Sequence, residues 1–157
     1  MRILIVYKAS GLSDNPFVRL LAEGIRACGF EVVCSVGEFW NRAEAYDVIH
    51  LQWPEELFGW SYPTAEQVAA LRERFRTLHE KEIPVVYTRH NARPHKGDTQ
   101  LAKAYRLTEE NADAVVVIVS EETGSISVAI GGMLKRHLKP ETLANILRNE
   151  LLPQEAG

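Results

Sequence analysis

Hydrophobic positions along this chain fall into short runs that alternate with amphipathic segments. Apolar runs rich in β-branched residues cover residues 2–7, 30–35, 46–51, 84–90 and 114–119, and they predict five strands. Helices are predicted to begin at Asn15-Pro16, at Pro63-Thr64 and at Thr99. The strands and helices alternate, so we expect an α/β, Rossmann-like domain with a mostly parallel five-stranded sheet and helices on both faces. The first helix is expected to bury a stripe made of Phe17, Leu20, Leu21, Ile25 and Cys28.

The pattern changes after Ser120. Residues 121–124 predict a turn, and residues 125–130 alternate between apolar and polar side chains. Gly131-Gly132 indicates a hairpin, because both positions can adopt positive φ, and residues 133–138 form the returning strand. Pro140 then introduces a C-terminal helix. We therefore expect one domain over residues 1–157, in which an antiparallel hairpin and this helix extend the sheet. The apolar side of the helix comprises Leu143, Ile146, Leu147 and Leu151.

Composition narrows the possible functions. Apolar residues make up 46% and charged residues 25% of the chain, as in ordinary globular domains. A net charge of −3 provides no basic face, so we expect no nucleic-acid partner. Residues 114–119 form the longest apolar run, which is too short for a transmembrane segment, and we expect a cytoplasmic location. Two cysteines, Cys28 and Cys34, suggest neither a disulfide framework nor a metal site.

Chemically versatile side chains follow the third strand. Ligands of parallel sheets bind beyond the carboxyl ends of the strands, and His50, Gln52, Trp53 and Glu55 lie at such an end. A tryptophan offers a flat face on which a sugar ring can stack, and a neighbouring carboxylate can accept hydroxyl protons. An equally supported interpretation is that His50 is a hydrogen-bonded core histidine and that Trp53 fills space under a loop.

Two further strand ends carry polar residues. His90 follows the fourth strand and can hydrogen-bond a sugar hydroxyl or act as a base, while Arg89 and Arg93 can pair with phosphate oxygens. A solvated loop is the alternative. Residues 11–15 precede the first helix, whose N-terminus favours anions, but the GxGxxG pattern is absent and a capped turn explains Asn15 equally well.

Three segments in order, NPFVRLLAEGIRACGFEVV, YDVIHLQWPE and PVVYTRHNARPH, resemble the N-terminal, acceptor-side domain of bacterial GT-B glycosyltransferases over residues 1–116. Gln52 departs from that pattern, which commonly has a histidine there. The resemblance implies that His90 contacts the reacting sugar of a sugar or lipid-linked acceptor. It also implies an acceptor cleft lined by Asn15, Trp53, Glu55, Asn91 and His95.

Glycosyltransferases of this family hold the nucleotide-sugar mainly in a second domain. Only about 40 residues follow the fifth predicted strand, which is too few for such a domain. The resemblance therefore implies an acceptor-binding domain that is inactive alone. We expect no cofactor on this chain, and a nucleotide-sugar donor only if a partner chain supplies the donor domain.

Residues 107–152 are similar to a different family. LTEENADAVVVIVSEETGSISVAI, followed by GGMLKRHLKPETLANILRNELL, resembles the C-terminal part of bacterial diadenylate cyclase domains. The resemblance implies that Ser120, Glu121 and Glu122 lie near ATP and a divalent metal. The Asp-Gly-Ala motif of that family is absent, and residues 89–91 match only two residues of its Arg-His-Arg motif. A solvated hairpin turn is therefore the favoured interpretation of Glu121 and Glu122.

The two resemblances overlap at residues 112–116. They suggest a composite chain with a transferase-like part over 1–116, a cyclase-like hairpin and helix over 117–152, and a tail over 153–157. A third hypothesis is a structural or interaction module without a small-molecule site.

Overall fold

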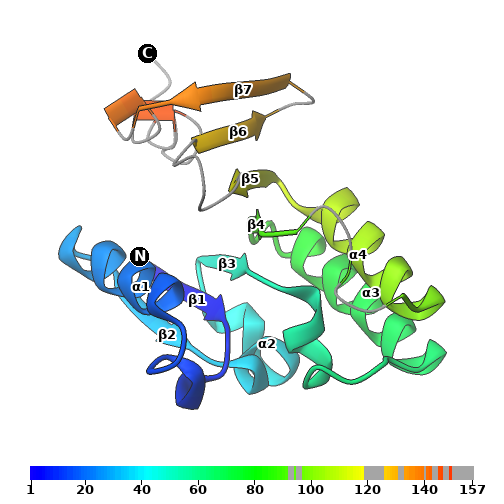
Figure 1. Cartoon of the computed structure of the whole chain (residues 1–157). Coiled ribbons are helices and arrows are strands. Elements are labelled where there is room, and N and C mark those ends of the chain that lie inside the picture. The colour runs from blue at the N-terminus through cyan, green and yellow to red at the C-terminus, as the bar shows by residue number, and fades with distance from the viewer. Residues whose placement is uncertain are drawn as a thin grey trace.

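The protein is described by a computed structural model that covers residues 1–91, 94, 97–118, 126–130 and 133–139, with residues 141–142, 145–146 and 149. The strands of the described residues form a seven-stranded sheet. They are β1 (Arg2–Val6), β2 (Glu31–Cys34), β3 (Val48–Leu51), β4 (Val85–Arg89), β5 (Ala114–Ile118), β6 (Ile126–Ile130) and β7 (Met133–Leu138). The strand order is β2-β1-β3-β4-β5-β6-β7 (Figure 1).

The predicted fold class is confirmed. The first five strands pair in parallel, and β6 and β7 extend the sheet as an antiparallel hairpin beside β5. The turns expected at residues 121–124 and 131–132 lie outside the described residues, and so does most of the expected C-terminal helix.

Among the described residues, four helices connect the parallel strands. They are α1 (Pro16–Ala27), α2 (Val36–Arg42), α3 (Ala65–Glu80) and α4 (Thr99–Asn111), with short 3-10 turns η1 (Ala9–Gly11), η2 (Ala43–Ala45) and η3 (Pro54–Phe58). Thr64 and Gln67 form the capping box that begins α3. The helix α2 was not predicted, although Ser35 caps it and Glu38 stands three residues later, which is a helix-start spacing.

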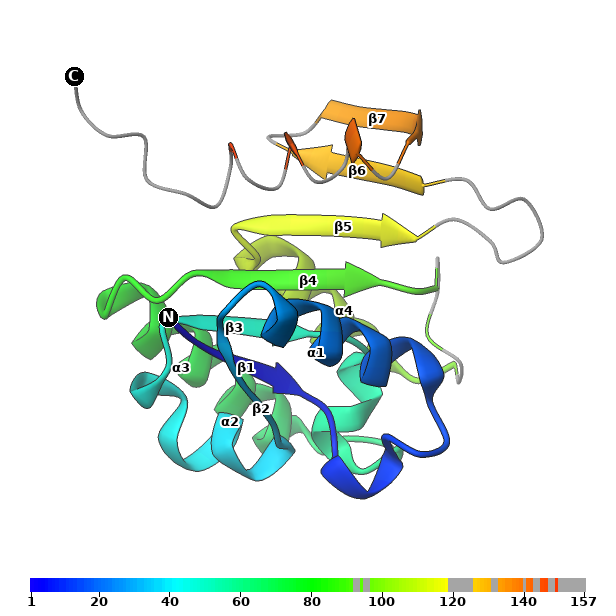
Figure 2. The same ribbon diagram turned by 90° about the vertical axis from the view of Figure 1, so that its left-hand side faces the viewer.

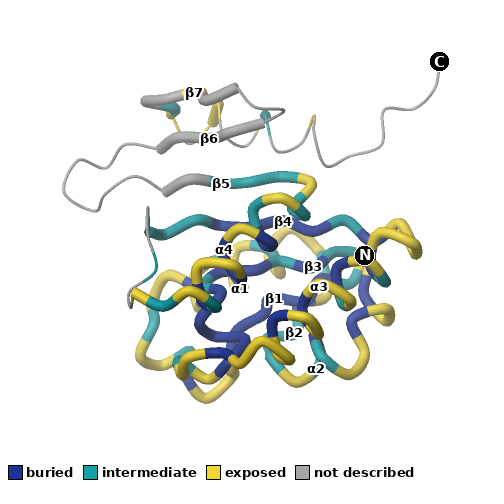
Figure 3. The backbone as a smooth tube through the Cα atoms, turned by 90° about the vertical axis from the view of Figure 1, so that its right-hand side faces the viewer, coloured by how far each residue is buried: buried dark blue, intermediate teal, exposed yellow. Residues whose placement is uncertain are grey.

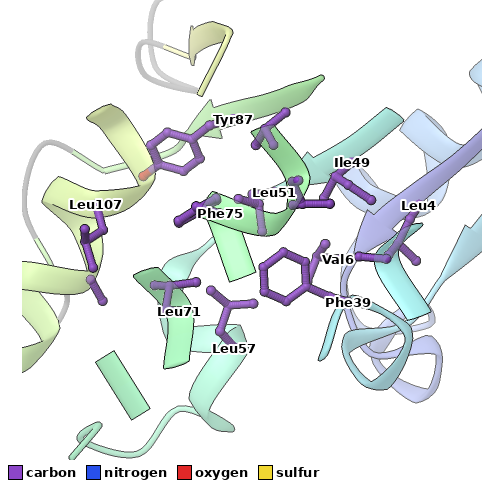
Figure 4. Packing of buried hydrophobic residues seen from close by; sticks show 14 of the residues in the cluster. Leu4, Val6, Phe39, Ile49, Leu51, Leu57, Leu71, Phe75, Tyr87 and Leu107 are labelled. Carbon is purple, nitrogen blue, oxygen red and sulfur yellow. The ribbon is translucent and has the colours of Figure 1, made fainter. Parts of the chain in front are cut away.

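The helices cover the two faces of the sheet unequally, as Figures 1 and 2 show. Right-handed crossovers place α2, α3 and α4 on one face and α1 on the other. The larger core lies under α2, α3 and α4, where Phe39, Leu71 and Phe75 pack against β1, β3 and β4 (Figure 4). In Figure 3 the central strands are buried along most of their length, while the outer surfaces of the helices are exposed.

The buried stripe of α1 differs from the predicted one. Val18 and Ala22 are the buried positions and pack on Ile5 and Val32. Phe17 and Leu20 remain 38% and 57% exposed. Leu21 and Ile25 pack against the sheet whether the helix buries the side that contains Phe17 or the side that contains Val18. Because Ala22 is small, α1 can approach the sheet closely on the Val18 side, and this side is the buried one.

The end of α3 has an unusual residue in a common motif. The Ile83 N–H donates to the Leu78 carbonyl at 2.9 Å and the Glu82 N–H to the His79 carbonyl at 3.0 Å, which is the Schellman pattern. That pattern places Glu82 in the left-handed region, with φ of 55°. A side chain with a Cβ is strained there.

We predict that Glu82→Gly stabilises the domain by about 0.5–1 kcal/mol, because glycine adopts this φ without strain. Urea denaturation followed by circular dichroism measures the change. The matched control is Arg72→Gly, at an exposed position inside α3, which should destabilise by about 1 kcal/mol. Equal destabilisation by the two substitutions would contradict the assignment of strain to Glu82.

Candidate functional site

The carboxyl ends of β1, β3 and β4 lie side by side. Val6 pairs with Leu51, and Leu51 pairs with Tyr87, so the strands end almost level with one another. In Figure 2 the arrowheads of these strands point the same way. The residues that follow each strand therefore meet along one edge of the sheet, as the sequence predicted.

Five aromatic rings meet on the α1 side of this edge. The rings of Trp53 and His90 stack with their centroids 3.8 Å apart and their planes 15° apart. Phe17 contacts His90 in an edge-to-face arrangement at 4.9 Å. Tyr7 and Trp60 lie beside Trp53 at 6.0 and 6.4 Å. We call Tyr7, Phe17, Trp53, Trp60 and His90 the aromatic cluster; Tyr7 is buried, Phe17 is exposed and the other three are half-buried.

Gln52 lies against this cluster and is only 1% exposed. Nε2 of His90 donates to Oε1 of Gln52 at 2.9 Å in the tautomer that carries the proton on that nitrogen. The amide nitrogen of Gln52 is buried and has no hydrogen-bond partner among the described residues. An unsatisfied buried donor of this kind costs about 1–3 kcal/mol.

His50 is a packed histidine rather than an exposed one. Its Nε2 lies 2.7 Å from Oγ1 of Thr88 on the neighbouring strand, and its register partner Ile5 belongs to the core under α1. Burial, with a smaller contribution from repulsion by His90, lowers the pKa of His50 from 6.5 to about 4. The ring is therefore neutral at pH 7, in agreement with the core-histidine interpretation.

Glu55 and Asn91 lie toward α4, away from the aromatic cluster. The Tyr105 hydroxyl donates to Oε2 of Glu55 at 2.7 Å, and Glu55 is 2% exposed. The Asn91 side chain also hydrogen-bonds Tyr105. Burial and the bond to Glu55 raise the pKa of Tyr105 far above its ordinary value, so the hydroxyl keeps its proton and remains a donor. These residues tie the ends of β3 and β4 to α4.

A strained turn positions Trp60. Gly59 and Trp60 both have left-handed backbones, with φ of 61° and 62°, and a tryptophan is strained in that conformation. The indole N–H of Trp60 donates to the buried carboxylate of Glu56. The other oxygen of Glu56 accepts the backbone N–H of Lys8 at 3.0 Å, which joins the turn to the end of β1.

The loop before α1 is a capped turn. The Asn15 side chain accepts the Val18 N–H at 3.3 Å, and Pro16 has no N–H. The N–H groups of Asp14 and Asn15 both donate to the Gly11 carbonyl. The amides of Asp14, Asn15 and Val18 are thus already used, which favours the capped-turn interpretation of residues 11–15.

Several predicted site residues cannot be placed. Arg93 and His95, and the alternative set of Ser120, Glu121 and Glu122, lie outside the described residues. Arg89 pairs with Glu109 at 3.3 Å on the side of α4. Across the described part of the chain, no group of three or more histidine, cysteine, aspartate or glutamate side chains could hold a metal ion.

The sequence reasoning missed three members of this region. Phe17 was assigned to the buried stripe of α1, yet it reaches His90. Trp60 was not singled out, and the left-handed turn that places it gives no clear sequence signal. Gln52 was placed at the end of the third strand and noted as a departure from a motif, but the burial of its amide was not predicted.

A surface depression of about 470 Å³ lies at the opposite, amino edge of the sheet. It is lined by His79, Glu82, Ile83, Pro84 and Asp113. The Asp113 carboxylate accepts the Val85 N–H at 2.7 Å, and so joins the start of β4 to the segment before β5. The depression thus lies away from the aromatic cluster.

Comparison with known proteins gives a distant structural likeness. No protein-family model matches the chain, and no curated protein matches it. Among solved structures, the chain is similar to chemotaxis protein CheY4 of Vibrio cholerae, with a TM-score of 0.47 and 14% sequence identity. The match covers 94% of this chain and 96% of that one. A likeness this distant assigns no activity.

These comparisons overturn both family resemblances. The glycosyltransferase and diadenylate cyclase interpretations are wrong, because no model of either family matches the chain. Three hypotheses that rested on these resemblances are also wrong. They are the inactive acceptor-binding domain, the nucleotide-binding alternative and the chimeric origin. The strand-end positions of His90, Trp53, Glu55 and Asn91 do not depend on those families.

Within the described part of the chain, no helix has the length and apolar character needed to cross a membrane.

We predict that His50 makes stability fall in mild acid. The unfolded chain gains a proton on this ring below pH 6.5, whereas the folded chain resists protonation down to about pH 4. Stability therefore decreases with falling pH between these values, by up to about 1.4 kcal/mol per pH unit. His50→Gln should flatten that part of a denaturation–pH profile. Parallel profiles for wild type and His50→Gln would contradict the assignment.

We predict that Tyr105→Phe destabilises the domain by about 1–3 kcal/mol, because the buried carboxylate of Glu55 loses a donor. Urea denaturation measures this change. Tyr62→Phe is the matched control, since Tyr62 is 55% exposed, and it should cost much less. Equal midpoints for Tyr105→Phe and wild type would show that the bond contributes nothing.

Proposed function

We propose that this protein is a small-molecule-binding domain whose ligand contains a flat ring and binds at the aromatic cluster. The observation that carries the proposal is the half-buried stack of Trp53 on His90, bordered by the exposed ring of Phe17, at the carboxyl edge of the sheet. Ligands of open parallel sheets bind along this edge.

The chemistry of the cluster favours a flat, largely apolar ligand. Aromatic rings contribute large contact areas with few rotatable bonds, so that ordering them on binding costs little entropy. Four of the rings, all except the buried Tyr7, remain accessible although they pack on one another. Hydrogen bonds to buried side chains fix two of the rings: Trp60 bonds the carboxylate of Glu56, and His90 bonds the amide of Gln52. Accessible aromatic rings that are already fixed in position favour a ligand-binding role for the cluster over a role in core packing alone.

The polar residues near Tyr105 support the site from outside. Glu55 and Asn91 meet the Tyr105 hydroxyl on the other side of the edge, where Glu55 is buried. We therefore assign them to holding the ends of β3 and β4 in place. Trp53 and Phe17 are the residues that we expect to contact the ligand.

The proposal is tested by titrating the protein with indole and with quinoline, and with cyclohexanol as a ligand of similar size without a flat aromatic ring. Backbone and indole signals in two-dimensional NMR report binding. We expect indole and quinoline to shift the signals of Trp53 and Phe17. We also expect Trp53→Leu to weaken both by about tenfold or more, as the loss of a stacking contact does.

Trp40→Phe is the matched control, because Trp40 packs in the core on the opposite face and should leave binding unchanged. If cyclohexanol binds as well as quinoline, or if Trp53→Leu leaves the affinities unaltered, the cluster is not a site for flat rings.

A further inference from the structure

The ring of His90 makes two contacts that a bound heterocycle would also make. It lies 3.8 Å from Trp53 and nearly parallel to it, and its Nε2 reaches Oε1 of Gln52 at 2.9 Å. We infer that the Trp53 face and the Gln52 amide form a subsite for a planar heterocycle bearing adjacent hydrogen-bond donor and acceptor groups, and that His90 fills this subsite in the present structure. This inference rests on the proposed function, for which it names the ligand class.

The amide of Gln52 sets the ligand class. A primary amide presents one acceptor oxygen and one donor nitrogen side by side. His90 engages only one of them, and the nitrogen is left buried without a partner among the described residues. If the amide is turned over, its nitrogen faces His90 and its oxygen becomes the orphan, so one group is unsatisfied in either orientation. A lactam edge, with N–H beside C=O, satisfies both groups.

The position of His90 makes it displaceable. β4 ends at Arg89, so His90 is the first residue beyond the strand ladder, and it is half-buried. Phe17, which covers it edge-on, is 38% exposed. Gln52, in contrast, is 1% exposed and follows β3 directly. The amide thus forms the fixed base of the subsite, and the imidazole is the part that moves.

Two expectations follow. A heterocycle that enters the subsite of the wild-type chain must first displace His90. The apparent affinity of the heterocycle is therefore its intrinsic affinity multiplied by the fraction of molecules in which His90 has left the subsite. Removal of the imidazole should therefore strengthen binding. Selectivity should depend on the Gln52 amide, because stacking on Trp53 is available to any flat ring.

The test uses His90→Gly and three probes of similar size: 2-pyridone with adjacent N–H and C=O, pyridine with a ring nitrogen alone, and toluene with neither. Affinities are measured by NMR titration of the full chain, with the Trp53 indole and Gln52 amide signals as reporters. In His90→Gly we expect 2-pyridone to bind about tenfold more tightly than toluene, with pyridine between them. We also expect 2-pyridone to bind His90→Gly about tenfold more tightly than wild type.

Gln52→Leu supplies the matched control, because leucine keeps most of the volume and removes both amide groups. In the His90→Gly background it should abolish the preference for 2-pyridone while retaining toluene binding. The same substitution in the wild-type background should also abolish that preference, which gives a second measurement if His90→Gly does not fold by circular dichroism.

The outcomes separate the two proposals. If flat rings bind in a Trp53-dependent manner but Gln52→Leu leaves their ranking unchanged, the heterocycle subsite is refuted and the proposed function stands. If His90→Gly binds 2-pyridone no better than wild type, His90 does not occupy the subsite. If none of the probes, nor indole or quinoline, binds any variant, both proposals fail.

Discussion

The parallel register of β1, β3 and β4 is the constraint on which the rest of the site depends. Hydrogen bonding between the strands sets Val6 beside Leu51 and Leu51 beside Tyr87. Since successive side chains in a strand point to opposite faces, this register also decides which face each side chain joins. Ile5 and His50 are thereby directed toward α1, while Leu51 and Tyr87 enter the core beneath α3 and α4.

The same alternation divides the carboxyl edge into two halves with different physical characters. Toward α1, the edge is aromatic and only partly covered, with Trp53, His90 and Phe17 in contact. Toward α4, the edge is polar but buried, and the hydroxyl of Tyr105 binds the carboxylate of Glu55. A ligand can reach only the accessible half, so the buried half is better understood as the structure that keeps the strand ends together.

Periodicity predicted most of the fold because each strand and helix has its own local pattern. It placed α3 and α4 correctly and predicted the hairpin of β6 and β7. It misjudged α1, since apolar residues surround much of that helix and only packing on the sheet selects Val18 over Phe17. The short α2 was missed because seven residues span only two turns, too few to establish a helical period.

The sequence predicted where the candidate site lies in the fold, but not how its side chains contact one another. The strand-end rule brought Trp53 and His90 to one edge, yet it could not show that they stack or that Glu55 turns toward Tyr105. The family resemblances failed for a related reason. Asn15 before Pro16 begins a capped helix, and the polar residues that follow β3 and β4 end buried strands. Any sheet of this kind needs such features, so they indicate the fold rather than a family.

The energetics of Gln52 connect the stability of the fold to the selectivity of the site. Displacement of His90 breaks its stack on Trp53, its edge contact with Phe17 and its hydrogen bond to Gln52. A bound heterocycle restores the stack and the hydrogen bond, at the entropy cost of association. The heterocycle adds a bond to the orphan amide nitrogen, and so relieves the cost of about 1–3 kcal/mol that an unsatisfied buried donor imposes. Selectivity can therefore be high even where affinity is modest, because a ring without the second polar group leaves the orphan amide nitrogen unsatisfied.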